Sequence, residues 1–496
     1  MKYNSLPFVM AAACLLIASC SNEEIGTPAQ QSQKEIQYHI GQETSFDDFM
    51  QQFEMLKDVI ESMEEGEEKE NLKKNLDELM ESLKSLCGDF VGENGNTSSF
   101  SVRTDTIIYP TTDCNGGSIS LSGFIHYPMS GGKIPFDEIE GMVINCHATK
   151  PQGVAIEEIA QAFGDMKIDL KKYGLGDVDK LINGIYTLKQ LTADGVIVLE
   201  PDYEGFGCTS DRPQTYLCQK LIAKQCADMI QPVLDLTKKM YGKDITDNKN
   251  FSSYIVGYSQ GGGQALALTR YLTVEDKPLL EKINLVNSVC GAGPYDPQLT
   301  FHTWLERKEI GMSVLLPMVL SGYMAGHPDI MKYDNGNTID IKSYFSDKYN
   351  NYPEEGYGIP QRVKNMDNGF TQGMGYDIKN GKVWGVVAHK VPILDLMSDE
   401  AKNSDSYIMQ ALDSCLRMEQ VCYDWTPVTS VILLSTEFDN IVPVDNTHKA
   451  YEILHKKAGN LVSKVIAKNA YDHVLGQVGY TTTLITNQLY KKINKK

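Results

Sequence analysis

The sequence predicts an α/β protein built on a mostly parallel, doubly wound sheet. Over residues 100–490, short apolar runs of the kind that form buried strands alternate with segments of helical periodicity. Two runs at the start of this region alternate in polarity instead, which is typical of half-buried strands at an antiparallel edge. Strands that alternate with helices favour parallel pairing, so the remaining strands are expected to form a parallel sheet covered by helices.

The strands are expected in a definite order. Residues 101–109 and 118–127 are separated by turn residues and predict an antiparallel hairpin. The buried strands are expected at 141–146, 195–199, 254–258, 283–290, 431–435 and 462–467. Between about 297 and 424 this alternation stops, and the apolar segment 314–324 is interrupted by Pro317. We expect a helical insertion here that forms a cap.

The N-terminus predicts an exported lipoprotein. Lys2 precedes an apolar run at 8–17 that is too short to span a membrane, so residues 1–19 are expected to be a signal peptide. Ile17-Ala18-Ser19-Cys20 resembles a bacterial lipobox, which implies cleavage before Cys20 and lipid attachment to it. An ordinary signal peptide is the alternative. The acidic residues at 23–24 resemble an export signal for outer-surface lipoproteins, so we expect a lipid anchor in the outer membrane of the bacterial cell envelope.

Two further segments precede the predicted sheet. Residues 20–43 are polar and are expected to be a tether. Residues 44–93 are acidic and carry apolar residues at spacings of three and four, with a break at 64–71. Ser45 followed by Asp48 resembles a capping box. This pattern predicts an antiparallel helical hairpin, which could be a spacer, a partner-binding coil or a unit packed on the rest of the chain.

Composition limits the classes of partner. The formal net charge of −19 disfavours nucleic acid and anionic membranes. Eleven cysteines include Cys14 and Cys20, which leaves an odd number in the remaining chain. The pairs Cys208/Cys218 and Cys415/Cys422 are close enough in sequence to form disulfides, but spacing cannot establish a bridge. The chain contains no Cys-x-x-Cys and no His-x-x-x-His pattern, so we predict no metal and no cofactor.

The strand at 254–258 runs into Gly257-Tyr258-Ser259-Gln260-Gly261, and the segment 264–270 has the character of a helix. A strand, a sharp Gly-x-Ser-x-Gly turn and a helix together form a nucleophile elbow. Ser259 is therefore the candidate nucleophile. The backbone N–H of Gln260, at the start of the helix, is a candidate oxyanion donor.

Several motifs then follow one another in an order that resembles the α/β-hydrolase superfamily. They are a His-x-Thr turn at 147–149, Pro-Asp-Tyr-x-Gly-x-Gly at 201–207, the elbow at 257–261 and Asp-x-x-Val-Pro at 439–443. Within that superfamily the chain looks like the secretory lipase and esterase branch, where Gly-Tyr-Ser-Gln-Gly-Gly occurs. The resemblance implies a catalytic triad in the order serine, acid, histidine.

The acid is expected after the strand at 431–435. Asp439 matches the Asp-x-x-Val-Pro register, and Glu437 is the rival carboxylate. The base is expected after the last strand, where His473 lies about 34 residues beyond Asp439. The sequence contains nine histidines, and His473 is preferred on position alone.

The second oxyanion donor is expected in the loop after strand 141–146. The usual His-Gly-Thr of the family reads His147-Ala148-Thr149 here, which leaves open whether Ala148 or Thr149 donates. Asp202 and Tyr203 are expected to order the neighbouring loop without touching the substrate.

Together these features predict a serine hydrolase that cleaves carboxylic esters, either small molecules or lipids, through an acyl-enzyme. A serine peptidase of the same fold is the first alternative. A surface lipoprotein that kept the fold, lost catalysis and binds a partner is the second.

Overall fold

The computed structural model describes residues 36–41, 43–45, 100–149, 195–210, 212–311, 315–346, 376–377, 382–383 and 391–468, together with residues 473, 476–477, 480, 484 and 489–491. The expected signal peptide, Cys20, most of the expected tether and nearly all of the expected helical hairpin lie outside these residues.

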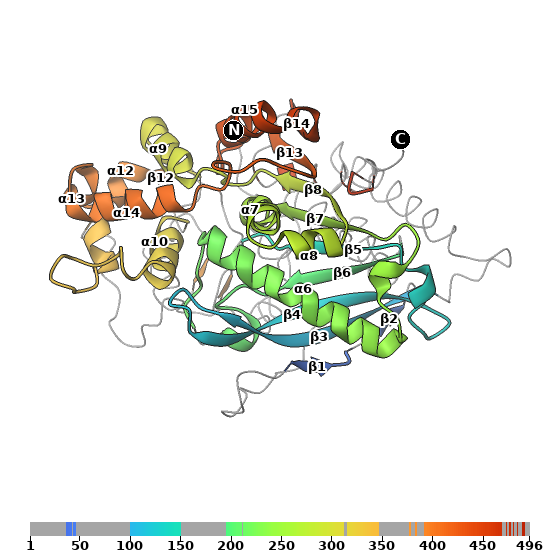
Figure 1. Cartoon of the computed structure of the whole chain (residues 1–496). Helices are drawn as coiled ribbons and strands as arrows, with labels where there is room; N and C mark the ends of the chain where they lie inside the picture. The colour runs from blue at the N-terminus through green and yellow to red at the C-terminus, as the bar shows by residue number, and fades with distance from the viewer. Residues whose placement is uncertain are drawn as a thin grey trace, which may run out of the picture.

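The described chain is organised around one ten-stranded sheet (Figure 1). Its order is β1-β3-β4-β6-β5-β7-β8-β13-β14, and β2 also pairs with β3. The strands are β1 (Gln37–His39), β2 (Glu43–Ser45), β3 (Phe100–Thr112), β4 (Ser118–Ser130), β5 (Gly141–Cys146), β6 (Val196–Pro201), β7 (Ser252–Tyr258), β8 (Leu285–Gly291), β13 (Ser430–Thr436) and β14 (Val462–Ala467). The strands from β6 to β14 pair in parallel, whereas β1, β2, β3 and β4 form an antiparallel edge. The predicted mostly parallel sheet with an antiparallel edge is confirmed.

The strands β1 and β2 correct the sequence-based expectation at the N-terminus. Residues 37–39 were expected in the tether, yet they pair with β3, and Ser45 lies in β2 instead of capping a helix. The buried carboxylate of Asp105 on β3 accepts the hydroxyl of Tyr38 and, at 3.0 Å, the backbone N–H of Gly41. Arg103 donates to the same carboxylate at 2.8 Å. This charge-assisted cluster holds the short segment on the sheet edge.

Helices and C-terminal residues cover the two faces of the sheet. The long helix α6 (Gln219–Tyr241) lies beside α7 (Gln260–Val274) on one face, with α8 (Lys277–Lys282) following α7 (Figure 1). Apolar residues of these helices and of α15 (Asp445–Ala458) share one buried cluster with the strands. A second buried cluster packs Tyr480, Leu484 and Tyr490 against the strands. The sheet is therefore apolar on both faces, as parallel strands require.

The helices between β8 and β13 gather at one end of the sheet, at the left of Figure 1, where a cap was expected. They are α9 (Pro297–Arg307), α10 (Leu315–Gly326), α12 (Ile393–Leu396), α13 (Asp399–Lys402) and α14 (Tyr407–Met418), with the short pairs β9 (Glu309–Ile310) with β12 (Val391–Pro392), and β10 (Tyr376–Asp377) with β11 (Lys382–Val383). Most of their apolar residues pack in one buried cluster that also contains Tyr216 and Ile441. Pro317 does not interrupt α10, because it lies in the first turn, where a backbone N–H has no partner within the helix.

The cysteines that were close enough in sequence to pair do not form disulfides. Cys208, Cys218, Cys415 and Cys422 are all free thiols. Burial raises the pKa of Cys415 and of Cys422 to about 12, so both remain protonated near neutral pH. Within the described part of the chain, no helix is both long enough and apolar enough to cross a bilayer.

Candidate active site

Ser259 lies at a sharp turn between β7 and α7. Its φ of 57° and ψ of −123° fall in a region that residues with a side chain rarely occupy. The turn is held by the backbone N–H of Ser259, which donates to the carbonyl of Gly291 at 2.8 Å, and by Gly263, which donates to the carbonyl of Ser259 at 3.1 Å. The strained backbone places Ser259 at the carboxyl end of a central strand, in the geometry of a nucleophile elbow.

The two glycines of Gly-x-Ser-x-Gly allow β7, α7 and β5 to approach closely. A Cβ atom at position 257 would lie 2.2 Å from the carbonyl oxygen of Gly261. A Cβ atom at position 261 would lie 2.0 Å from the carbonyl oxygen of Cys146, at the end of β5. Because real contacts of this kind are much longer, any side chain at either position would force the backbone apart.

His473 contacts Ser259 with one side of its ring and Asp439 with the other. Its Nε2 lies 2.7 Å from Oγ of Ser259, and its Nδ1 lies 2.7 Å from Oδ2 of Asp439. A carboxylate only accepts hydrogen bonds, so Nδ1 carries the proton and Nε2 is free to accept the hydroxyl of Ser259. The three predicted residues therefore meet in the arrangement that makes a serine nucleophilic.

The carboxylate of Asp439 is held by backbone groups of its own loop. Oδ1 accepts the N–H of Ile441 at 3.0 Å and that of Val442 at 2.8 Å, which leaves Oδ2 directed at the imidazole. Asp439 is 3% exposed, whereas Glu437 is exposed to solvent. The structure therefore places Asp439, and not Glu437, beside His473.

Other histidines in the described residues contact different groups. His389 lies outside the described residues. The partners are Thr104 for His126, Asp413 for His302, Glu419 for His327, Lys464 for His448 and the carbonyl of Val462 for His455.

The loop at 147–149 follows β5 and lies against the first turn of α7, close to Gly261. The ring of His147 stacks on Tyr203 with the centroids 3.8 Å apart, and the hydroxyl of Tyr203 donates to the carbonyl of His147 at 3.0 Å. The side chain of Thr149 shares a hydrogen bond of 2.9 Å with the hydroxyl of Tyr216. Burial raises the pKa of Tyr216 to about 12, so this hydroxyl keeps its proton. The backbone of the loop is thus held beside the start of α7, where Gln260 lies.

Comparison with known proteins supports the same architecture. No protein-family profile and no curated protein sequence matches the chain. Among solved structures, the rice cell wall degrading esterase LipA from Xanthomonas oryzae is similar, with a TM-score of 0.58 and 16% identity over 92% of this chain and 98% of that one. A hydrolase-like protein from Legionella pneumophila gives a TM-score of 0.55 and 16% identity over 84% and 96% of the two chains.

The fold is that of the α/β-hydrolases. In this fold the nucleophile follows a central parallel strand, the acid and the histidine follow later strands, and the oxyanion loop follows a neighbouring strand. Ser259 after β7, Asp439 after β13, His473 beyond β14 and the loop after β5 occupy those positions.

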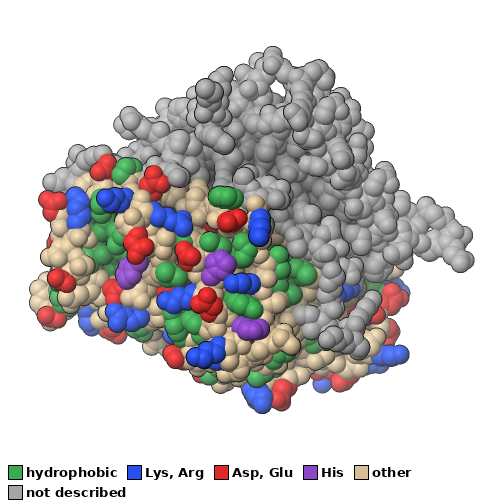
Figure 2. All heavy atoms as spheres, turned by 90° about the horizontal axis from the view of Figure 1, so that it is seen from above, with side chains coloured by type: hydrophobic (Ala, Val, Ile, Leu, Met, Phe, Trp, Pro, Cys, Tyr) green, Lys and Arg blue, Asp and Glu red, His purple; other side chains and the backbone are tan. Residues whose placement is uncertain are grey.

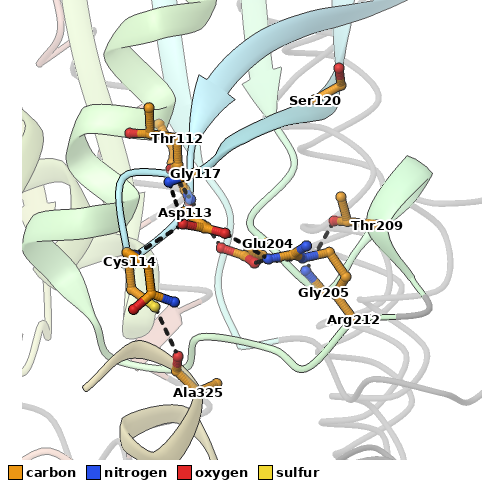
Figure 3. A network of polar contacts seen from close by, with 12 residues as sticks. Thr112, Asp113, Cys114, Gly117, Ser120, Glu204, Gly205, Thr209, Arg212 and Ala325 are labelled. Carbon is orange, nitrogen blue, oxygen red and sulfur yellow. Dashed lines mark hydrogen bonds and ion pairs between the residues drawn. The ribbon is translucent and has the colours of Figure 1, made fainter. Parts of the chain in front are cut away.

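The α/β-hydrolase fold of this chain also carries a polar network that supports the loop after β6 (Figure 3). Arg212 donates to Oε1 of Glu204 at 2.7 Å and to Oδ2 of Asp113, in the turn between β3 and β4, at 3.4 Å. In the same turn, the thiol of Cys114 donates to the carbonyl of Ala325 on α10 at 3.2 Å. Glu204 is 4% exposed, so its ion pair with Arg212 offsets the cost of burying the carboxylate. The network links the antiparallel edge, the loop of Tyr203 and the cap.

Three residues that sequence reasoning did not assign contact the predicted site residues. Tyr258 and Asn440 contact the backbone of His473, and Tyr216 contacts Thr149. In the sequence, the only indication of a role for Tyr258 and Asn440 is that each adjoins a predicted triad residue. No group of three or more potential metal ligands occurs in the described residues.

Proposed function

We propose that this protein is a serine hydrolase that cleaves carboxylic ester bonds through an acyl-enzyme intermediate. The observation that carries the proposal is the contact of His473 with both Ser259 and Asp439, at 2.7 Å each. A serine hydroxyl is a weak nucleophile unless a neighbouring base removes its proton. This arrangement supplies the base and a carboxylate that orients it.

The reaction follows from the geometry. Oγ of Ser259 attacks the ester carbonyl while its proton passes to Nε2 of His473, and Asp439 stabilises the resulting imidazolium. The bond to the alcohol then breaks as His473 returns the proton to the leaving oxygen. Water, activated by the same histidine, next attacks the acyl-enzyme, releases the acid and restores Ser259.

The negative oxygen of each tetrahedral intermediate needs preorganised donors. We assign this role to the backbone N–H of Gln260 and to an N–H of Ala148 or Thr149. The contacts of Gly261 with the end of β5 bring these two segments together. Removing a single donor of this kind from a hydrolase costs about 10²- to 10³-fold in turnover. The chemistry needs no cofactor, because the side chains supply both the nucleophile and the base.

The choice of an ester, rather than an amide, draws on the similar fold of the Xanthomonas oryzae protein, which is described as an esterase. The substrate is proposed to be a small-molecule or lipid ester. On the face shown in Figure 2, acidic, basic and apolar side chains of the described residues are interspersed. The formal net charge of −19 disfavours nucleic acid as a partner. We further propose that Cys20 carries a lipid that anchors the protein in the bacterial outer membrane.

A fluorophosphonate probe and a set of substrates test the proposal together. The probe mimics the tetrahedral intermediate and should label Ser259 in the wild-type protein. Labelling should disappear in Ser259→Ala, slow severely in His473→Ala and persist in Ser253→Ala, a matched control in which a buried serine of the same strand is lost. Hydrolysis of esters of graded acyl length should exceed that of aminoacyl amides. Faster amide cleavage would identify a peptidase, and a folded protein inert to the probe would favour the binding lipoprotein.

A further inference from the structure

The backbone of His473 makes hydrogen bonds as well as its ring. Its N–H donates to Oδ1 of Asn440 at 3.3 Å, and its carbonyl accepts the hydroxyl of Tyr258 at 2.6 Å. With the two ring contacts, His473 makes four hydrogen bonds to residues that the structure describes.

The partners of the backbone are sequence neighbours of the partners of the ring. Tyr258 immediately precedes Ser259, and Asn440 immediately follows Asp439. The elbow thus contacts both Nε2 and the carbonyl of His473, while the acid loop contacts both Nδ1 and the N–H. The elbow and the acid loop each make two hydrogen bonds to His473, and together these bonds fix the position of the imidazole.

Tyr258 has little room to move. Tyr258 is 5% exposed, and the centroid of its ring is 5.3 Å from that of His473 and 5.3 Å from that of Tyr480. A Cβ atom at position 476 would lie 2.6 Å from the hydroxyl of Tyr258, so the backbone of Gly476 lies close to that hydroxyl. The phenol of Tyr258 is therefore held in the orientation in which its hydroxyl donates to the carbonyl of His473.

Tyr480 also connects the C-terminal residues to the sheet. Its hydroxyl accepts the N–H of Gly257 at 3.0 Å and donates to the carbonyl of Val289 at 3.0 Å, which fastens the C-terminal residues to β7 and β8. The last strand of the sheet ends at Ala467, so His473 lies beyond the sheet ladder. Its position depends on side-chain contacts such as these.

We propose that Tyr258 and Asn440 are positioning residues that place the His473 imidazole between Ser259 and Asp439. The inference rests on the proposed function of that site. Proton transfer is sensitive to displacements well below 1 Å, so losing one backbone contact lowers turnover even when the fold persists. A residue that acts only through His473 should change turnover and leave substrate binding nearly unchanged.

The first test replaces Tyr258 by Phe, which keeps the ring and removes the hydroxyl. We expect kcat and the rate of fluorophosphonate labelling to fall about 3- to 10-fold, the factor that corresponds to one net hydrogen bond, with KM nearly unchanged. The matched control is Tyr344→Phe in the cap, where a buried hydroxyl also donates to a backbone carbonyl, that of Ile408, at 2.8 Å. Both variants should lose a similar amount of stability, and only Tyr258→Phe should lose turnover.

A double variant separates positioning from a general structural effect. If Tyr258 acts through His473, Tyr258→Phe should cause no further loss of residual activity in a His473→Ala background. The same factor of loss in both backgrounds would overturn the inference. Asn440→Ala should reproduce the loss of kcat and the same non-additivity, which provides a second reading if Tyr258→Phe folds poorly.

Different results would contradict the proposed function and the positioning role. A folded wild-type protein that neither reacts with the probe nor cleaves esters contradicts the proposed function. A reactive wild-type protein with an equally reactive Tyr258→Phe variant leaves the proposed function standing and contradicts the positioning role.

Discussion

Nδ1 of His473 lies 2.7 Å from Oδ2 of Asp439, a residue 34 positions earlier in the chain. The other oxygen of that carboxylate is occupied by two backbone N–H groups of its own loop. The carboxylate therefore cannot rotate without losing several hydrogen bonds, and it keeps the imidazole in the tautomer that accepts the proton of Ser259.

Replacing Asp439 by Asn should abolish most of the activity. The amide can present its NH₂ group to Nδ1, which favours the wrong tautomer, and the same change costs about 10⁴-fold in turnover in the serine-protease template. Glu437→Gln is the matched control, because Glu437 is exposed two residues earlier, and it should lose less than about 2-fold. Measuring kcat on one ester for both variants decides the point, and the reverse ranking would reassign the acid.

Gly261→Ala should disrupt the site through the backbone. The added methyl would lie 2.0 Å from the carbonyl of Cys146, so α7 and the loop after β5 would have to separate. We expect a loss of stability of about 3 kcal/mol or more and little remaining probe labelling. Gly116→Ala is the comparison, because its φ of 75° adds strain of about 1 kcal/mol but no atom lies within 4 Å. Equal behaviour of the two variants in thermal unfolding and labelling would contradict this explanation.

Removing the N-terminal region should lower stability and spare the chemistry. A chain that begins at Asn94 lacks β1 and β2, which leaves the β3 edge and the carboxylate of Asp105 without the contacts of Tyr38 and Gly41. We expect a lower unfolding midpoint with an unchanged kcat, since no predicted triad residue lies in that region. Asp105→Ala in the full chain should reproduce part of the stability loss. A folded truncation without activity would show instead that the N-terminal region contributes to the active site.

Cys20→Ser should release the protein from membranes. The lipobox-like sequence implies a lipid on the sulfur of Cys20, and a serine cannot carry the thioether. Cys14→Ser, within the expected signal peptide, is the matched control and should leave the protein in the membrane fraction. Cell fractionation compares the two variants. Mass spectrometry that finds an unmodified Cys20 in membrane-bound protein would refute the anchor.

Local pattern was sufficient for most of the central sheet. The strand expected at 141–146 has those bounds in β5, and those expected at 431–435 and 462–467 agree with β13 and β14 within one residue. Apolar runs bounded by turn residues identify such strands, because both faces of a parallel strand are buried. The hairpin of β3 and β4 followed from alternation in the same way.

Other features had no local signal. The short strand β1 pairs with β3, and its Tyr38 donates to Asp105, 67 residues away. Cys208, Cys218, Cys415 and Cys422 are free thiols, although their sequence spacing allowed disulfides. Spacing along a chain bounds the distance between two side chains but does not determine it.

By itself, the sequence determined the class of the sheet and the position of the elbow, and it identified Ser259, Asp439 and His473 as candidate residues. These features depend on residue type and on the pattern of neighbouring residues, which can be read directly from the sequence. Only the tertiary structure decided that Asp439 rather than Glu437 faces the imidazole, and that Tyr258 and Asn440 hold its backbone. Such contacts join residues as far as 215 positions apart, and they exist only once the carboxyl ends of β7 and β13 lie at the same edge of the sheet.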